Sequence, residues 1–164
     1  MADADRVLVA AWSRHGATAE IARHIAEQLE ADGSSVQLVL SRQTAGTYAD
    51  FVIGSPLYGA RSCGGALELA RRVRESGARL WLFSSGMQRP ERVTAPVGFS
   101  SRLHQHAHGS AYFQGRLDRS LLSRAERAVI DLLGVDDADG RDWSAVTAWA
   151  AAITAVRGAG VAHR

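Results

Sequence analysis

The feature that most constrains the fold of this chain is a set of short apolar runs whose hydrophobic residues are continuous rather than alternating. A run of this kind predicts a strand that is buried on both faces, as in a parallel sheet covered by helices. We expect five such strands, at residues 7–12, 36–40, 50–54, 80–83 and 111–113.

Segments with helical periodicity lie among these runs. Ile21, Ile25 and Leu29 recur every four residues and predict a helix that ends near Gly33, because glycine is common just past a helix C-terminus. Residues 66–73 predict a second helix. The connection between the second and third strands is short for a crossover helix. Residues 87–108 are expected to be irregular.

Two helices are expected to close the chain. One covers residues 118–134, and the other begins after Asp142, whose side chain suits an N-cap. In the last helix, Trp143 and Trp149 fall on the stripe that faces the core. The apolar residues of the earlier helix are Leu121, Leu122, Ala125, Val129, Leu132 and Leu133.

This alternation of strands and helices predicts one α/β domain over residues 1–164. The expected architecture is a doubly wound, five-stranded parallel sheet in the order 2-1-3-4-5, with helices on both faces. In such sheets a ligand binds beyond the carboxyl ends of the strands, at the switch point between strands 1 and 3. The loops to inspect are therefore residues 13–18, 54–65 and 84–90.

Composition and charge exclude several classes of protein. Of the 164 residues, 46% are apolar, which suits the core of one ordinary domain. The 19 basic residues, all arginine, alternate with 17 acidic ones, so we expect solvated helix faces and no nucleic-acid partner. No apolar stretch reaches the roughly 20 residues of a membrane span, and the acidic N-terminus does not resemble a secretory signal. A lone cysteine forms no internal disulfide, and we expect a cytoplasmic protein.

The loop after the first strand has the properties of an anion site. It leads into a helix, whose first amide groups lack internal partners and lie at the positive end of the helix dipole. Two hydroxyls, an arginine and a glycine that permits close approach of a phosphate complete the pattern. The alternative is an N-capping loop that binds nothing. The candidate residues are Ser13, Arg14, His15, Gly16, Ala17 and Thr18.

The loops after the third and fourth strands are further candidates. Tyr58 stands between small residues at a strand end, where its ring can lie on a flat ligand. Hydroxyls and amides after the fourth strand can bind the polar edge of a heterocycle. The candidate residues are Ser55, Pro56, Leu57, Tyr58, Gly59 and Ala60, followed by Ser84, Ser85, Gly86 and Met87.

Other patterns are less specific. His104, His106 and His108 alternate and would share one face of an extended segment, where a metal site, a surface loop and contact with a ligand are the alternatives. Cys63 is expected to be a passive small residue rather than a reactive thiol. The chain lacks a Gly-Lys-Ser/Thr loop, a Gly-x-Gly-x-x-Gly motif and a Gly-x-Ser-x-Gly elbow, which argues against ATP, dinucleotides and serine-hydrolase chemistry.

Three segments resemble, in order, the FMN-binding loops of flavodoxin-like proteins. They are Ser13-Arg14-His15-Gly16-Ala17-Thr18, Ile53-Gly54-Ser55-Pro56-Leu57-Tyr58-Gly59 and Phe83-Ser84-Ser85-Gly86. The chain is most similar to the flavodoxin-domain branch that includes the menaquinone-dependent protoporphyrinogen dehydrogenases. That similarity rests on the first loop together with Gly115-Arg116-Leu117, Asp139-Gly140-Arg141-Asp142-Trp143 and Trp149-Ala150.

The resemblance implies that FMN binds noncovalently, with its phosphate on residues 13–18 and its isoalloxazine between residues 55–60 and 84–88. The flavin would carry the redox chemistry, so no catalytic side chain is required. The implied function is an FMN-dependent oxidoreductase or electron-transfer protein, with a quinone, a porphyrinogen or a reductase as redox partner. A flavin-free binding or regulatory module with the same fold is the alternative. A homodimer is one option for the assembly.

The chain departs from the family pattern in three places. It is slightly basic, whereas electron-shuttling flavodoxins are acidic, so a shuttle role is less favoured. Residues 118–134 indicate an ordinary amphipathic helix instead of the apolar basic insertion of the protoporphyrinogen-oxidising relatives. Met87 stands where flavodoxins often place a stacking aromatic, which would leave one ring face more open.

Overall fold

The five apolar runs form one parallel sheet. In the computed structural model, which describes residues 5–41, 46–57, 62–93 and 98–161, the strands follow the order β2-β1-β3-β4-β5. The predicted fold class and strand order are therefore confirmed. The strands are β1 (Arg6–Ala11), β2 (Ser35–Leu40), β3 (Asp50–Pro56), β4 (Arg79–Gly86) and β5 (Gly109–Gln114).

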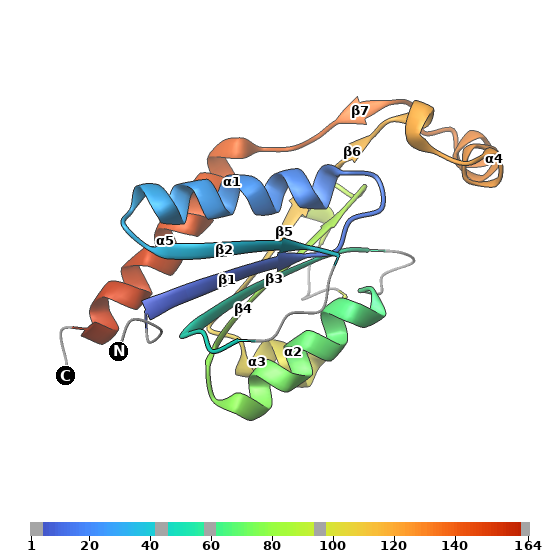
Figure 1. Ribbon diagram of the computed structural model, residues 1–164. Coiled ribbons are helices and arrows are strands. Elements are labelled where there is room, and N and C mark those ends of the chain that lie inside the picture. The colour runs from blue at the N-terminus through green and yellow to red at the C-terminus, as the bar shows by residue number, and fades with distance from the viewer. Residues whose placement is uncertain (1–4, 42–45, 58–61, 94–97, 162–164) are drawn as a thin grey trace.

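Helices cover both faces of the sheet (Figure 1). α1 (Ala17–Ala31) and α5 (Trp143–Val161) pack on one face, whereas α2 (Gly64–Ser76) and the short α3 (Ser101–His106) cover the other. Asp142 caps α5 as predicted, because its carboxylate accepts a hydrogen bond from the amide of Ala145 at 3.1 Å.

Successive residues of the central strands face opposite layers of helices, which explains why the apolar runs are continuous. Val7 and Val9 of β1 pack in the core beneath α1 and α5, whereas Leu8 and Ala10 pack in the core beneath α2 and α3. All four side chains are fully buried. A strand in this position has no solvent-exposed face, so apolar and polar residues do not alternate in its sequence.

A second, two-stranded sheet carries a projecting segment that the sequence did not predict. β6 (Arg116–Leu117) and β7 (Ala138–Asp139) pair antiparallel, and between them lie the 3₁₀ turn η3 (Arg119–Leu121) and α4 (Arg124–Leu133). We call residues 116–139 the arm. Figure 1 shows the arm extending past the carboxyl edge of the main sheet, away from both termini.

The helix expected over residues 118–134 is present in part as α4, but its apolar stripe is not packed against the main sheet. No residue of α4 is buried, and Leu132 is 88% exposed. The helix begins with a capping box: Ser123 Oγ accepts a hydrogen bond from the amide of Glu126, and the Glu126 carboxylate accepts one from the amide of Ser123. Local capping, more than burial, therefore supports this helix.

Other segments also differ from the expectation. Residues 87–108 are not irregular throughout, because they contain the 3₁₀ turn η2 (Pro90–Arg92) and α3. Trp149 packs against the core as predicted, but Trp143 is 37% exposed. Among the helices of the described residues, none combines the length and the hydrophobicity that crossing a bilayer requires.

A buried ion-pair network closes the amino edge of the sheet, where β3 and β4 begin. Asp50 is fully buried, and its carboxylate accepts hydrogen bonds from Arg79 Nε and Nη2, both at 2.7 Å, and from Trp81 Nε1 at 3.0 Å. Arg157 Nε of α5 donates a further bond at 2.8 Å. The network thus ties two strands to the last helix, at the end of the sheet opposite the predicted ligand loops.

Candidate functional site

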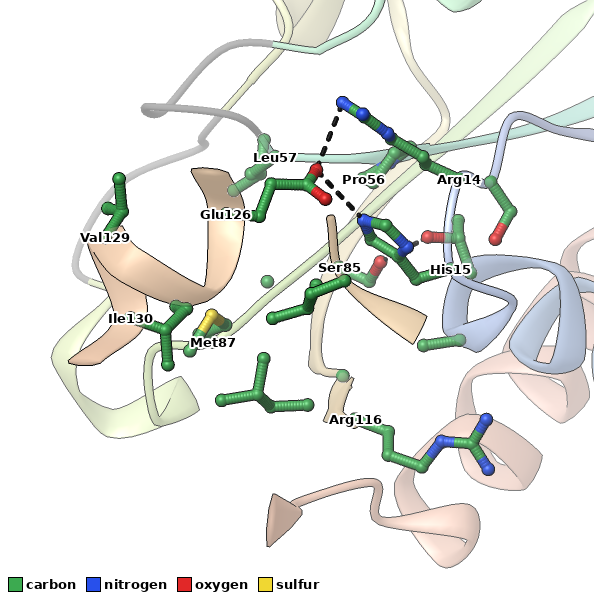
Figure 2. A pocket seen from close by; sticks show the side chains of 17 residues that line it. Arg14, His15, Pro56, Leu57, Ser85, Met87, Arg116, Glu126, Val129 and Ile130 are labelled. Carbon is green, nitrogen blue, oxygen red and sulfur yellow. Dashed lines mark hydrogen bonds and ion pairs between the residues drawn. The ribbon is translucent and has the colours of Figure 1, made fainter. Parts of the chain in front are cut away.

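A pocket of about 300 Å³ lies at the carboxyl edge of the sheet. This volume falls at the lower end of the range for small-molecule sites, about 300–1,000 Å³. Figure 2 shows Arg14 and His15 on one side of the pocket and Val129 and Ile130 of α4 on another. The edge between strands 1 and 3 is where doubly wound sheets bind ligands. We name the predicted loops by their residues: loop A is 13–18, loop B is 55–60 and loop C is 84–87.

Loop A leads from β1 into α1 and leaves the start of that helix uncapped. Gly16 is the N-cap residue, with a φ of 91° that favours glycine. Its amide donates a hydrogen bond to Ser13 Oγ at 2.9 Å, which closes the loop. Within the described residues, no side chain caps α1. The amides of the first helical turn therefore remain available to an anion at the positive end of the helix dipole.

Three hydrogen bonds hold the loops together around the pocket. Thr18 Oγ1 and Ser85 Oγ are 2.7 Å apart and join loop A to loop C. The amide of Leu57 donates to the carbonyl of Ser85 at 2.8 Å and joins loop B to loop C. The amide of Gly115 donates to the carbonyl of Gly86 at 2.7 Å. Because Thr18 and Ser85 are buried, these contacts fix loop A, loop C and the described start of loop B relative to one another.

The structure brings most of the predicted residues to this pocket. Ser55 and Ser84 are instead buried in the strand ends, and Ser55 Oγ accepts a hydrogen bond from the amide of Cys63 at 2.8 Å. Gly16 contributes through the backbone of loop A. Three predicted residues lie outside the described residues: Tyr58, Gly59 and Ala60. The predicted residues that line the pocket are Ser13, Arg14, His15, Ala17, Thr18, Pro56, Leu57, Ser85, Gly86 and Met87.

The arm lines one side of the pocket, which the sequence analysis did not predict. The apolar stripe of α4 was the available signal, but such a stripe is equally consistent with packing against a sheet. Residues 115–117 were named only as part of the family resemblance, and no role at the site was predicted for them. The additional lining residues are Gly115, Arg116, Leu117, Leu122, Glu126, Val129 and Ile130.

One carboxylate of the arm reaches both basic side chains of loop A (Figure 2). Glu126 Oε1 lies 3.2 Å from Arg14 Nη1 and 3.4 Å from His15 Nε2. Hydrogen bonds from Ser123 lower the pKa of Glu126, and the charges of Arg14 and His15 lower it further, so this carboxylate is ionised at neutral pH. The pocket is therefore charged beside loop A. Its apolar lining comes from Pro56, Leu57, Met87, Leu117, Leu122, Val129 and Ile130.

The neighbouring strand contacts the residue that follows loop C. The hydroxyl of Tyr112 in β5 donates a hydrogen bond to the carbonyl of Gln88 at 2.8 Å. Burial raises the pKa of Tyr112, which keeps this hydroxyl protonated and able to donate. Met87 lines the pocket while 46% exposed, so its flexible side chain stands at the mouth.

The remaining sequence candidates do not assemble a site. His104 and His106 lie on α3 rather than in an extended segment, which removes the premise that the three histidines share a face. His104 Nδ1 is 2.9 Å from Ser110 Oγ, and the ring of His108 packs 5.8 Å from that of Trp81. Across the described ranges, no cluster of three or more His, Cys, Asp or Glu side chains could hold a metal ion.

Known structures share this fold. The rubredoxin oxygen:oxidoreductase of the anaerobe Desulfovibrio gigas is 14% identical, with a TM-score of 0.62 over 98% of this chain and 38% of its own. The flavodiiron protein of Giardia intestinalis is 16% identical, with a TM-score of 0.51 over 90% of this chain and 38% of its own. The Megasphaera elsdenii flavodoxin, in its two-electron reduced state, is 19% identical, with a TM-score of 0.50 over 65% of this chain and 84% of its own.

This chain therefore spans well under half the length of the first two of these proteins, and at such identities the likeness shows the fold alone. No curated protein matches the chain. A family model described as "Flavodoxin domain", however, matches residues 8–142, which is most of the sequence. The chain belongs to the flavodoxin-domain family.

Proposed function

We propose that this domain binds FMN noncovalently and acts as an oxidoreductase or electron-transfer domain. One observation carries the proposal: three strand-end loops, tied by hydrogen bonds, meet in a pocket that has an uncapped helix N-terminus beside it and apolar side chains across it. FMN has the matching form, with a phosphate at one end and a flat ring system at the other. Family membership supports the same ligand.

Loop A would hold the phosphate. The free amides of the first turn of α1 and the hydroxyl of Ser13 supply donors, and the guanidinium of Arg14 supplies charge. Thr18 lines the same end of the pocket, and its contact with Ser85 links the phosphate site to loop C. We infer that loops B and C hold the ring, with Met87 at its open side and α4 opposite loop A.

The bound flavin would supply the redox chemistry, and the protein would bind it, orient it and keep water from part of its surface. We assign no catalytic side chain. A net charge of +2 does not match the strongly acidic surface of electron-shuttling flavodoxins. The comparisons lend no support to the protoporphyrinogen dehydrogenase branch, so the proposal names neither donor nor acceptor.

The visible spectrum of the purified protein, followed by titration with FMN, tests the proposal. We expect flavin absorption bands, or stoichiometric uptake with quenching of flavin fluorescence. Ser13→Ala and Thr18→Ala should each weaken binding by about 0.5–3 kcal/mol, because each removes a polar donor. Thr154→Ala is the matched control, since it removes a hydroxyl that bonds Asp32 at 2.9 Å outside the pocket. A colourless protein that ignores FMN would favour the flavin-free binding module instead.

A further inference from the structure

A carboxylate of the chain itself lies on loop A. Glu126 contacts Arg14 at 3.2 Å and His15 at 3.4 Å, and the same three residues line the pocket (Figure 2). The two basic side chains of the proposed phosphate site are thus already engaged by an anion from the arm. A phosphate that binds loop A must share them with Glu126 or displace it.

The position of this carboxylate is set by α4 rather than by chance contact at the surface. Glu126 is the third residue of the helix, and the capping box with Ser123 fixes its second oxygen. The side chains of Glu126 and His15 are only 27% and 25% exposed, so both lie partly shielded from solvent. The contact with His15 is therefore the better shielded of the two, whereas the pair with Arg14, which is 61% exposed, is screened by solvent.

Among the described residues, the arm has one further ion pair to the main domain, between Arg116 Nη2 and Glu20 Oε1 of α1 at 3.7 Å. Its two strands pair over only two residues each, and no residue of α4 is buried. Its pocket-side contacts, with Glu126 at their polar end, therefore contribute much of what keeps the helix over loop A. A change in the charge on loop A therefore changes the strength of the Glu126 contacts that hold the arm there.

We propose that Glu126 is an internal competitor of the flavin phosphate: it latches α4 onto loop A, and a phosphate bound there releases the latch. This inference rests on the proposed function. A bound phosphate and the Glu126 carboxylate would both carry negative charge beside Arg14 and therefore repel each other, so phosphate binding and latching are antagonistic. Thermodynamic linkage makes this effect reciprocal. If the Glu126 contact lowers the affinity for the phosphate by some factor, a bound phosphate weakens the Glu126 contact by the same factor. Riboflavin has the ring without the phosphate, so it does not compete with Glu126 for loop A.

Titration of three proteins with both FMN and riboflavin tests the latch. Glu126→Gln removes the charge but keeps the capping box, because glutamine serves equally well at this position. It should tighten FMN binding about three- to tenfold, because it removes a partly shielded negative charge beside Arg14, and leave riboflavin binding within about twofold. Asp131→Asn is the matched control: it lies on the same helix, is 61% exposed and pairs with Arg119 instead of loop A. It should change neither affinity.

Hydrogen exchange of the α4 amides gives a second readout that does not depend on affinity. FMN should speed exchange over residues 124–133 in the unmodified protein, riboflavin should not, and Glu126→Gln should abolish the difference. Flavin binding with unchanged or weaker FMN affinity in Glu126→Gln would overturn the latch and leave the FMN proposal standing. Equal tightening by Asp131→Asn would also overturn it, since overall charge would then be the cause. Failure of both flavins to bind the unmodified protein would overturn both proposals.

Discussion

Replacing Asp50 with alanine should destabilise the fold strongly while leaving the ligand loops unaltered. Asp50 is fully buried, and four hydrogen bonds from Arg79, Trp81 and Arg157 end on its carboxylate. Removing one partner of a buried ion pair costs about 3–5 kcal/mol, because the remaining charge stays buried without compensation. The side chain of Arg157 is only 8% exposed, so it cannot turn to water.

Two features place the expected loss at the lower end of this range, about 3–4 kcal/mol. Arg79 is 28% exposed and can regain water. Arg157 keeps its hydrogen bonds to Ser34 and Asp5. Such a loss is a large part of the 5–15 kcal/mol by which a typical domain is stable. Urea unfolding at neutral pH measures it as a shift in midpoint at constant slope. The control, Asp131→Ala, breaks an exposed pair and should cost less than about 1 kcal/mol.

The same network predicts a dependence on pH. Burial acts to raise the pKa of Asp50, but the hydrogen bonds from Arg79, Trp81 and Arg157 and the charge of Arg79 outweigh it and hold the pKa below its ordinary value. Since the folded pKa is depressed, this stabilisation is complete above the unfolded pKa of about 3.9 and is lost as pH falls through the folded pKa. Asp50→Asn should therefore flatten the acid limb of the stability curve. A loss below 1 kcal/mol in Asp50→Ala, or an unchanged acid limb in Asp50→Asn, would refute the reasoning.

Two further changes test the packing described above. Gly54→Ala should destabilise the sheet by about 1–3 kcal/mol, because the new Cβ would lie 2.0 Å from Cζ of Phe83. The control Gly64→Ala places its Cβ where nothing lies within 4 Å and should be neutral or slightly stabilising. Equal urea midpoints for the two variants would contradict this reasoning. Leu132→Gln should change stability by less than about 0.5 kcal/mol, since Leu132 is 88% exposed, whereas Leu103→Ala, at a residue 1% exposed, should cost about 2–5 kcal/mol. A large loss in Leu132→Gln would show that α4 is packed after all.

The main sheet could be predicted from the sequence because its signals are local. Continuous apolar runs such as residues 7–12, and helical stripes such as Ile21, Ile25 and Leu29, each record their surroundings within a few residues. Strand order then follows from the small number of ways to connect parallel strands, and the ligand edge follows from the order. Most residues of loops A and C line the pocket at this edge for the same reason, whereas their role in binding FMN stays a prediction.

The arm could not be predicted in the same way. Its two strands are two residues long, and they pair residues more than twenty positions apart, Arg116 with Asp139 and Leu117 with Ala138. So short a pairing leaves no periodic trace, and the stripe of α4 has the same pattern whether it meets a sheet or a pocket.

The sequence by itself determined a flavodoxin-like sheet and the edge at which sheets of this kind bind ligands, because hydrophobic periodicity is recorded in neighbouring residues. Only the tertiary structure decided that Glu126 meets Arg14 and His15 across more than a hundred positions, and that Arg157 reaches Asp50 at the other edge. Contacts of this kind depend on where whole elements come to rest, and charged residues on a helix look alike in sequence whether they face water or a partner.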